Sequence, residues 1–473
     1  MSKSTSTRVG ILIGLVACLA GGGCFGGEAA VNIGSRLELF VDDYLIDRMD
    51  GVSLLLHHPV PREEVIRFDA PWEGDTSAYV TVFKDGDRYR MYYRGSSGKN
   101  EHPELTCTAE SADGITWTKP KLGIYECMGT NENNIVWMSA GVHALVPFKD
   151  ANPDAKPGEA YKAVGPFSGA NVKNALYAYA SPDGYHWKQL GDGPIITEGA
   201  FDSQNLAFWD AKRKEYVCYF RDFGNGIRDV KRSTSKDFLH WTKPEWLIWT
   251  GAPPEHLYTN AIAPYSRAPH IYLGFPKRFV PERKAIESHP ITGVSDAVFI
   301  SSRDGLNFHR WPEAFIRPGP DPNNWTDRNV MPAWGLLELT PEEISIYYSQ
   351  HYRHPTSHMV RGTLRTDGFV SVHAGAKGGE MVTKPLIFQG RELVLNYSTS
   401  AIGSVRVELG DGEGKPVPGF TLDDCPAIYG DEIERVVKWS AGTGVSSLAG
   451  KPVRLRFELK DADLYSIRFR GME

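Results

Sequence analysis

The sequence predicts an all-β protein, with a five-bladed β-propeller over residues 35–378 followed by a C-terminal β-sandwich over residues 379–473. Three observations support this fold class. A short motif containing an aspartate returns five times, strand-like segments rich in aromatic residues precede each copy, and the C-terminal part alternates polar and apolar residues without the motif. Strong self-similarity at a regular spacing is the sequence signature of a repeat architecture.

The repeated motif has the spacing of propeller blades. Its copies lie roughly 54 to 70 residues apart, about the size of one four-stranded blade with its loops. Glycine supplies the positive φ of a tight hairpin, and the Ser and Asp side chains bond nearby amides. We therefore interpret the aspartates as structural turn residues. The copies are SADGITW (Ser111–Trp117), SPDGYHW (Ser181–Trp187), SKDFLHW (Ser235–Trp241), SRDGLNF (Ser302–Phe308) and RTDGFVS (Arg365–Ser371).

Strand-like segments surround every copy of the motif. Upstream stand aromatic-rich stretches such as RYRMYYR and EYVCYFR, and a second stretch such as LTCTAES leads directly into the turn. Alternating β-branched and aromatic residues favour strands over helices. Closing the ring requires one blade to take a strand from the opposite terminus, because an open sheet edge is exposed. Residues 37–58 are the expected source of that strand.

The C-terminal part has a different pattern. Segments such as GSVRVELGDGEGKPVPGF and KPVRLRFELKDADLYSIRF alternate polar and apolar residues between Gly- and Asp-rich turns. This pattern is typical of a small antiparallel sandwich.

Residues 1–30 read as an export segment. A basic start, the brief apolar run VGILIGLVA and a stretch of small residues form this pattern, and the run is too short for a permanent membrane span. LVAC, ending at Cys18, resembles a bacterial lipoprotein signal, and lipidation of Cys18 would be the protein's one attachment to a membrane. Cleavage after Ala20 or Ala30 is the alternative. The expected location is periplasmic, outer-membrane-anchored or extracellular.

Charge and cysteine content exclude several classes. A formal charge of -6 over 473 residues, without blocks of like charge, argues against a nucleic-acid-binding surface. The cysteines after the export segment show no CxxC or Cys/His spacing, so no zinc site is predicted. No cofactor is expected, with a calcium ion in the channel as the alternative. These cysteines are Cys107, Cys127, Cys218 and Cys425.

Acidic residues precede the innermost strands of several blades. Blades are antiparallel, so the starts of inner strands and the ends of second strands lie at one mouth of the central channel. Glycosidic cleavage needs one protonated carboxylic acid and one carboxylate base or nucleophile. Carboxylates that converge from different blades also shift each other's pKa values. We predict Asp75, Asp202 and Glu255 as the catalytic set, with Glu73 close by; the alternative is that each caps a loop or pairs with an arginine.

Arginines end several second strands, at the same predicted mouth. They are Arg94, Arg221, Arg278 and Arg353. The planar guanidinium suits bidentate binding of carboxylate or sulfate, which indicates an anionic sugar such as a uronate or a sulfated residue. Alternatively, the arginines orient the catalytic acids. With stacking and hydroxyl contacts added, the predicted substrate-binding set is Arg94, His143, Arg221, His256, Tyr258, Arg278, Asp327 and Trp334.

Together these features resemble the five-bladed propeller glycosidases, the invertase and fructanase family 32 and the arabinanase and xylosidase family 43. The chain also resembles exported bacterial proteins that share LFVDDYLI and RTDGFVS. The resemblance implies a blade-one Asp as nucleophile or base, which transfers onto Asp75, and a later Glu as acid, assigned to Glu255. The invertase motif WMNDPNG and the Glu-Cys motif are absent, and PWEGDTSAYV stands in the first position.

The resulting expectation is an exported glycoside hydrolase. Asp75 is the nucleophile or base, Glu255 the acid and Asp202 a supporting carboxylate, acting on an oligo- or polysaccharide. Two alternatives stay open. One is a carbohydrate-binding propeller that has lost the acid; the other is a protein-interaction propeller, which the acidic and arginine residues at the mouth disfavour.

Overall fold

The computed structural model describes residues 29–99, 101–169, 172–440, 442 and 444–471. The predicted export segment and Cys18 therefore lie outside the described residues, apart from the last two positions of residues 1–30. The described chain is all-β: its helices are three short 3-10 turns, at Val142–Ala144, Pro322–Asn324 and Ser446–Leu448. None of its helices is long and apolar enough to cross a membrane.

Four of the sheets have four strands each, as expected for blades. Three of these are meanders of consecutive strands, and the fourth takes its edge strand from the N-terminal part. The strands are β6 (Ala78–Asp85), β7 (Arg88–Gly95), β8 (Leu105–Ser111) and β9 (Ile135–Trp137); β10 (Val146–Lys149), β11 (Tyr161–Gly169), β12 (Val172–Ser181) and β13 (Lys188–Leu190); β14 (Leu206–Asp210), β15 (Glu215–Gly224), β16 (Ile227–Ser235) and β17 (Glu245–Trp246); and β25 (Leu337–Glu338), β26 (Glu343–Gln350), β27 (His358–Arg365) and β5 (Val60–Arg67).

A seven-stranded sheet lies between the third and fourth of these in the chain. Its strands are β18 (Ile248–Thr250), β19 (His256–Leu257), β20 (Ala263–Tyr265), β21 (Ala268–Gly274), β22 (Lys277–Val280), β23 (Val294–Ser302) and β24 (Asn307–Ile316). Strands β20, β21, β23 and β24 follow the same order as a four-stranded sheet, and the short strands β18, β19 and β22 are additions to it.

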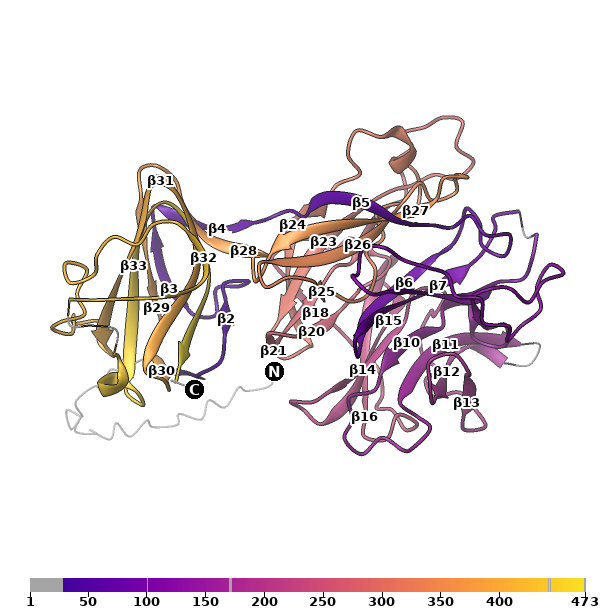
Figure 1. The fold of residues 1–473 in the computed structure, drawn as a ribbon, viewed down its shortest axis with the longest axis horizontal. Helices are drawn as coiled ribbons and strands as arrows, with labels where there is room; N and C mark the ends of the chain where they lie inside the picture. Colours follow the sequence, from indigo (N-terminus) through magenta and orange to yellow (C-terminus); the bar gives the residue numbers. More distant parts are fainter. Residues whose placement is uncertain (1–28, 100, 170–171, 441, 443, 472–473) are drawn as a thin grey trace, which may run out of the picture.

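The remaining strands form one ten-stranded sheet with a hydrophobic core of its own. They are β1 (Val31–Gly34), β2 (Glu38–Leu39), β3 (Ile46–Asp50), β4 (Val52–Leu56), β28 (Val370–Ala374), β29 (Gly379–Thr383), β30 (Leu386–Phe388), β31 (Glu392–Asp411), β32 (Asp431–Val436) and β33 (Pro452–Arg470). Figure 1 shows this sheet beside the group of smaller sheets, with the chain crossing between them in β4–β5 and β27–β28.

The expected source of the closing strand is wrong. Within residues 37–58, β2 pairs with β33, β3 with β29 and β4 with β28, all in the ten-stranded sheet. The strand that completes the last four-stranded sheet is the next one, β5, which pairs antiparallel with β27. The apolar residues of 37–58 fit either partner, and their local pattern does not show which strand they pair with.

The smaller sheets are arranged like the blades of a propeller. Inner-strand residues Phe83, Phe148, Phe208, Tyr265 and Leu337, one from each sheet, line a single cavity of about 590 Å³. Tyrosine hydroxyls also join neighbouring sheets. Tyr92 donates to the Gly184 carbonyl, Tyr219 to Gly305, and Tyr347 of the last sheet donates to Gly114 of the first. The tyrosine contact from last sheet to first closes the ring.

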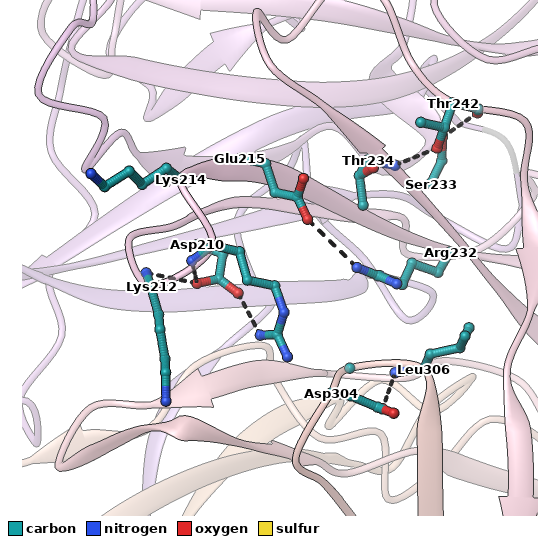
Figure 2. A network of polar contacts seen from close by, with 12 residues as sticks. Asp210, Lys212, Lys214, Glu215, Arg232, Ser233, Thr234, Thr242, Asp304 and Leu306 are labelled. Atoms are coloured by element: carbon teal, nitrogen blue, oxygen red, sulfur yellow. Dashed lines mark hydrogen bonds and ion pairs between the residues drawn. The ribbon is translucent and has the colours of Figure 1, made fainter. Parts of the chain in front are cut away.

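Four of the five motif aspartates are confirmed as turn residues of the expected kind. In the first four copies, one carboxylate oxygen accepts the backbone N–H groups two and three residues later; Asp113 Oδ1 binds Ile115 N at 2.8 Å and Thr116 N at 2.7 Å. These hydrogen bonds lower the pKa of Asp113 to about 2. Figure 2 shows the same turn at Asp304, which accepts the Leu306 N–H.

The neighbouring strand ends in Figure 2 are fixed in the same way, by local pairing. Asp210 accepts the Lys212 N–H at 2.9 Å, and Glu215 pairs with Arg232 at 3.7 Å. The fifth motif copy differs, because Asp367 is buried and accepts from Tyr265 and Arg267 of the seven-stranded sheet. We call this end of the sheets the hairpin end.

Candidate active site

The opposite end of the sheets, called the mouth here, is where the inner strands β6, β10, β14, β20 and β25 begin. Most of the predicted site residues lie in the segments that lead into these strands. Trp334 does not. It is buried, its indole N–H donates to the Ile262 carbonyl, and it lines the 590 Å³ cavity between the inner strands. Its size suggested stacking against a sugar, but its packing makes it a core residue.

Three buried tyrosines form the floor of the mouth. Tyr79, Tyr258 and Tyr352 belong to one small hydrophobic cluster. The hydroxyls of Tyr79 and Tyr258 lie 3.5 Å apart, and the Tyr352 hydroxyl accepts from Arg94 and Arg328. Tyr352 follows the end of β26, where sequence reasoning considered arginines alone.

Cations surround the ring of Tyr258. Distances from its centroid are 4.0 Å to Lys277 Nζ, 4.8 Å to Arg221 Cζ, 5.6 Å to Arg328 Cζ and 5.7 Å to Arg228 Cζ. Burial raises the pKa of Tyr258, but the positive charges of Arg328 and Arg221 outweigh burial, so its pKa lies below the usual value. Lys277, Arg228 and Arg328 were missed from the sequence. Lys277 begins β22, Arg228 lies near the start of β16, and Arg328 follows Asp327 in the loop before β25, so none stands at a second-strand end.

Lys277 is the most unusual of these cations. Its side chain is fully buried, and no hydrogen-bond partner for Nζ is found among the described residues. Burial, and then the positive charge of Arg328, push its pKa well below the usual lysine value. Buried lysines with strongly shifted pKa values concentrate at functional sites.

A second group at the mouth contains Arg94 and His143, both predicted. The buried Arg94 guanidinium lies 4.7 Å above the Tyr79 ring and pairs with Glu104 at 3.2 Å. His143 Nδ1 lies 2.8 Å from Glu104. Burial raises the pKa of Glu104, but the hydrogen bond with His143 and the charge of Arg94 together lower it by more. The net pKa lies below the usual value, so the carboxylate stays ionised. Glu104 stands in the loop before β8, outside the inner-strand starts that guided the predictions.

Three carboxylates from different sheets lie at the mouth. Asp75 is half-buried; its Oδ1 accepts the Gly98 N–H at 2.7 Å, and its carbonyl oxygen accepts the Arg353 N–H at 2.7 Å. Asp327 is buried against His289 at 2.9 Å and Arg353 at 3.3 Å. Asp202 is the most open, with a side chain 61% exposed, and it pairs with Arg221. Asp202 and His143 line a hollow of about 410 Å³.

Glu255 lies further from the tyrosine floor. Its carboxylate pairs with Arg278 at 3.3 Å and with Arg310 of the outer strand β24. Arg278 also binds Asp296 at 2.6 Å. The carboxylate of Glu255 is therefore engaged by two guanidinium groups, whereas a general acid must reach the leaving oxygen of the substrate. The adjacent His256 turns back toward the mouth and accepts the Arg228 N–H at 3.1 Å.

Asp229 was not predicted. Among the described residues it is the carboxyl group whose pKa is clearly raised, and the cause is burial, opposed by hydrogen bonds from Val230 N–H and the Trp249 indole. Arg310, the partner of Glu255, also acts on it. A raised pKa is what a general acid requires. The residue sits within β16, and the sequence carries no signal that separates it from other strand aspartates.

Several residues at the mouth have a left-handed backbone conformation. Tyr79, Arg328 and Arg353 have φ values of 58°, 61° and 65°, and Val330 and His351 have 53° and 58°. Left-handed φ is unfavourable for residues other than glycine, and such residues cluster at functional sites. The strain holds the Tyr79 ring and the arginines where an ordinary strand would not place them.

Comparisons with known proteins give remote similarities. No known family model matches the chain. The uncharacterized protein Rv1502 of Mycobacterium tuberculosis (strain H37Rv) is 27% identical over 151 residues, which are 30% of this chain and 42% of that protein. The match therefore spans less than half of that relative's length.

Solved structures of similar fold include carbohydrate-active enzymes. They are an N-acetylgalactosamine deacetylase from F. plautii (13% identity, TM-score 0.46, 68% of this chain and 97% of that chain), an endo-arabinase from Bacteroides thetaiotaomicron (14%, 0.41, 64% and 98%) and an α-L-arabinofuranosidase of Fusarium graminearum (11%, 0.40, 65% and 98%). Function is therefore inferred from the site itself.

Proposed function

We propose that the protein is a glycoside hydrolase that cleaves an oligo- or polysaccharide at the mouth. The observation that carries this proposal is the convergence of Asp75, Asp202 and Asp327, from three different sheets, around a floor of buried tyrosines. Converging carboxylates supply the acid–base chemistry of glycosidic cleavage.

Asp75 is the proposed nucleophile or base. Among the ion pairs of the described residues none involves it, so its charge is not committed to an arginine, while the Gly98 N–H fixes its orientation. Asp202 is the proposed supporting carboxylate. For the acid, the sequence indicates Glu255, and the raised pKa of Asp229 makes that residue the second candidate.

The finer fold and location are part of the same proposal. Counting the seven-stranded sheet as a blade gives a five-bladed propeller, and the ten-stranded sheet serves as its C-terminal sandwich. The basic and apolar start of the sequence supports export, with Cys18 as the lipidation site. Fractionation of producing cells tests export, and labelling with radioactive palmitate, compared with a Cys18→Ala variant, tests lipidation.

A reducing-end release assay tests the hydrolase proposal. The substrates are neutral, uronic and sulfated polysaccharides, and the variants are Asp75→Asn, Glu255→Gln and Asp229→Asn. Asp75→Asn should abolish release, and whichever of Glu255→Gln and Asp229→Asn removes the acid should do the same. Turnover by Asp75→Asn equal to that of the unaltered protein would remove Asp75 from the mechanism.

One observation favours a second function, a carbohydrate-binding propeller without catalysis. Glu255, the acid that the sequence indicates, is neutralised by two arginines. If Glu255 and Asp229 both prove dispensable, and saccharides bind without being cleaved, the binding function holds.

A further inference from the structure

Positive charge exceeds negative charge around Tyr258. Lys277, Arg221, Arg228 and Arg328 lie within 5.7 Å of its ring centroid. Arg221 is paired with Asp202. Arg328 lies 3.6 Å from Asp327, a carboxylate that Arg353 and His289 also share. In the described part of the chain, neither Lys277 nor Arg228 has a carboxylate within ion-pair distance.

Buried nitrogens in this cluster have no acceptor among the described residues. They are Lys277 Nζ, Arg221 Nε and Nη1, and Arg228 Nε. Lys277 is completely buried and the Arg221 side chain is 2% exposed. Buried polar groups are nearly always hydrogen-bonded, and buried charges are nearly always paired. Several unsatisfied nitrogens of basic side chains at one place, two of them on residues without an ion pair, therefore indicate a missing negative partner.

The upper side of the cluster is open to solvent. The Arg328 side chain is 32% exposed and Arg228 is half-buried, whereas Arg221 and Lys277 lie beneath them. A group that enters the mouth meets the two accessible guanidiniums first. Guanidinium groups bind the oxygens of carboxylates and sulfates in pairs, and the buried cations below add charge in a low-dielectric setting.

We infer that the mouth contains a subsite for an anionic group, held by Arg228 and Arg328 above Lys277 and Arg221. Its ligand is a carboxylate or a sulfate, carried by a sugar or present as a free oxyanion. As a sugar subsite, this inference rests on the proposed function and names its substrate class, an acidic saccharide. As an oxyanion site, it does not depend on catalysis. The lowered pKa values of Tyr258, Lys277 and Arg228 agree with an excess of positive charge.

Calorimetric titration of the full chain tests the subsite. The probes are glucuronate, glucose 6-sulfate, inorganic sulfate and neutral glucose. The variants are Arg228→Gln and Arg328→Gln. The matched control is Arg88→Gln, an arginine at the start of β7, at the hairpin end, with a side chain 48% exposed. We expect the two mouth variants to weaken binding of the charged probes at least tenfold and the control variant to leave it unchanged.

The outcomes separate the two proposals. Binding of the charged sugars without any turnover supports the subsite and leaves the hydrolase unsupported. Binding of inorganic sulfate alone, with the same response to the variants, supports the subsite and makes a free oxyanion its ligand. Cleavage of neutral oligosaccharides together with no binding of any charged probe overturns the subsite and leaves the hydrolase standing. Equal weakening by Arg88→Gln also overturns it, because the effect would then come from overall charge.

Discussion

The two ends of the propeller-like ring differ in whether their buried charged side chains have ion-pair partners. At the hairpin end, buried charges are matched: Lys162 pairs with Asp150 at 2.6 Å, and Asp210 pairs with Arg213 at 2.9 Å. At the mouth, Lys277 is buried without a carboxylate partner among the described residues. Folding alone therefore pairs these buried charges at the hairpin end, whereas at the mouth it leaves a buried positive charge without a carboxylate partner.

Backbone geometry separates the two ends less sharply. Three hairpin turns use glycine at positive φ, at Gly114, Gly184 and Gly305, but Phe238 and Asp367 have φ values of 71° and 61° in the other two. The mouth holds Tyr79 and Arg353 at positive φ, which costs free energy. Charge pairing is therefore the clearer difference between the two ends.

The largest expected effect separates an aspartate of the mouth from one of the hairpin end. Asp75→Asn should lower kcat by about 100-fold or more, because amide cannot replace a carboxylate base or nucleophile. Its melting temperature should stay close to that of the unaltered protein. Asp304→Asn should behave in the opposite way, with kcat unchanged and a lower melting temperature. Steady-state kinetics and thermal unfolding measure both, and loss of kcat in Asp304→Asn would break the distinction between the ends.

Lys277→Met should stabilise the protein while weakening anion binding. Removing a buried cation that lacks a partner should raise the free energy of unfolding by about 1–3 kcal/mol at neutral pH. The lysine pKa is lowered in the folded state, so the unfolded chain binds more protons below pH 10.5. The stability gap between variant and parent should therefore be full below the folded-state pKa and shrink as pH rises toward 10.5. Urea unfolding at pH 7 and pH 9 measures this gap; a gap that grows with pH would contradict the lowered pKa.

Tyr219→Phe should destabilise the hairpin end without touching the mouth. It removes the hydroxyl that donates to the Gly305 carbonyl at 2.6 Å and should cost about 1 kcal/mol. Tyr347→Phe removes the equivalent contact between the last and first sheets and serves as the matched variant. Denaturant titration gives both values, and an unchanged midpoint in both variants would mean that these contacts do not hold the ring.

The smallest effect concerns Asp113. Hydrogen bonds from Thr116 and Ile115 lower its pKa to about 2, so it contributes stability above the unfolded value near 3.9, and this is lost as pH falls through 2. Because the side chain is exposed, the contribution should be well under 1 kcal/mol. Unfolding curves of parent and Asp113→Asn should converge between pH 4 and pH 2. Curves that stay parallel would show that the carboxylate charge plays no part in the turn.

Much of the scaffold was predictable from sequence. The SxDG motif, its spacing and the aromatic strands before it indicated the sheets around the cavity and the structural role of Asp113 and its counterparts, because a hairpin is encoded by neighbouring residues. The partner of residues 37–58 was not predictable. Strand pairing over more than 300 residues depends on which edges are free in the folded protein.

The placement of several residues at the mouth was predictable from the sequence, and their partners were less so. The rule of strand starts and ends brought Asp75, Asp202, Arg94 and Arg221 to the mouth. The rule does not predict the direction of each side chain. Glu73, two residues from Asp75, turns into the core and pairs with Lys119 at 2.7 Å. Trp334 likewise belongs to the core.

By itself, the sequence determined the all-β class, the repeated turns and the acidic and arginine residues that gather at one end. The tertiary structure decided which charges are neutralised and which are left over. That distinction separates Arg278, held by Asp296 and Glu255, from Lys277, the next residue along the chain. Neighbouring side chains of a strand point to opposite faces. Whether a charge is neutralised therefore depends on the partners that other parts of the fold bring to its face.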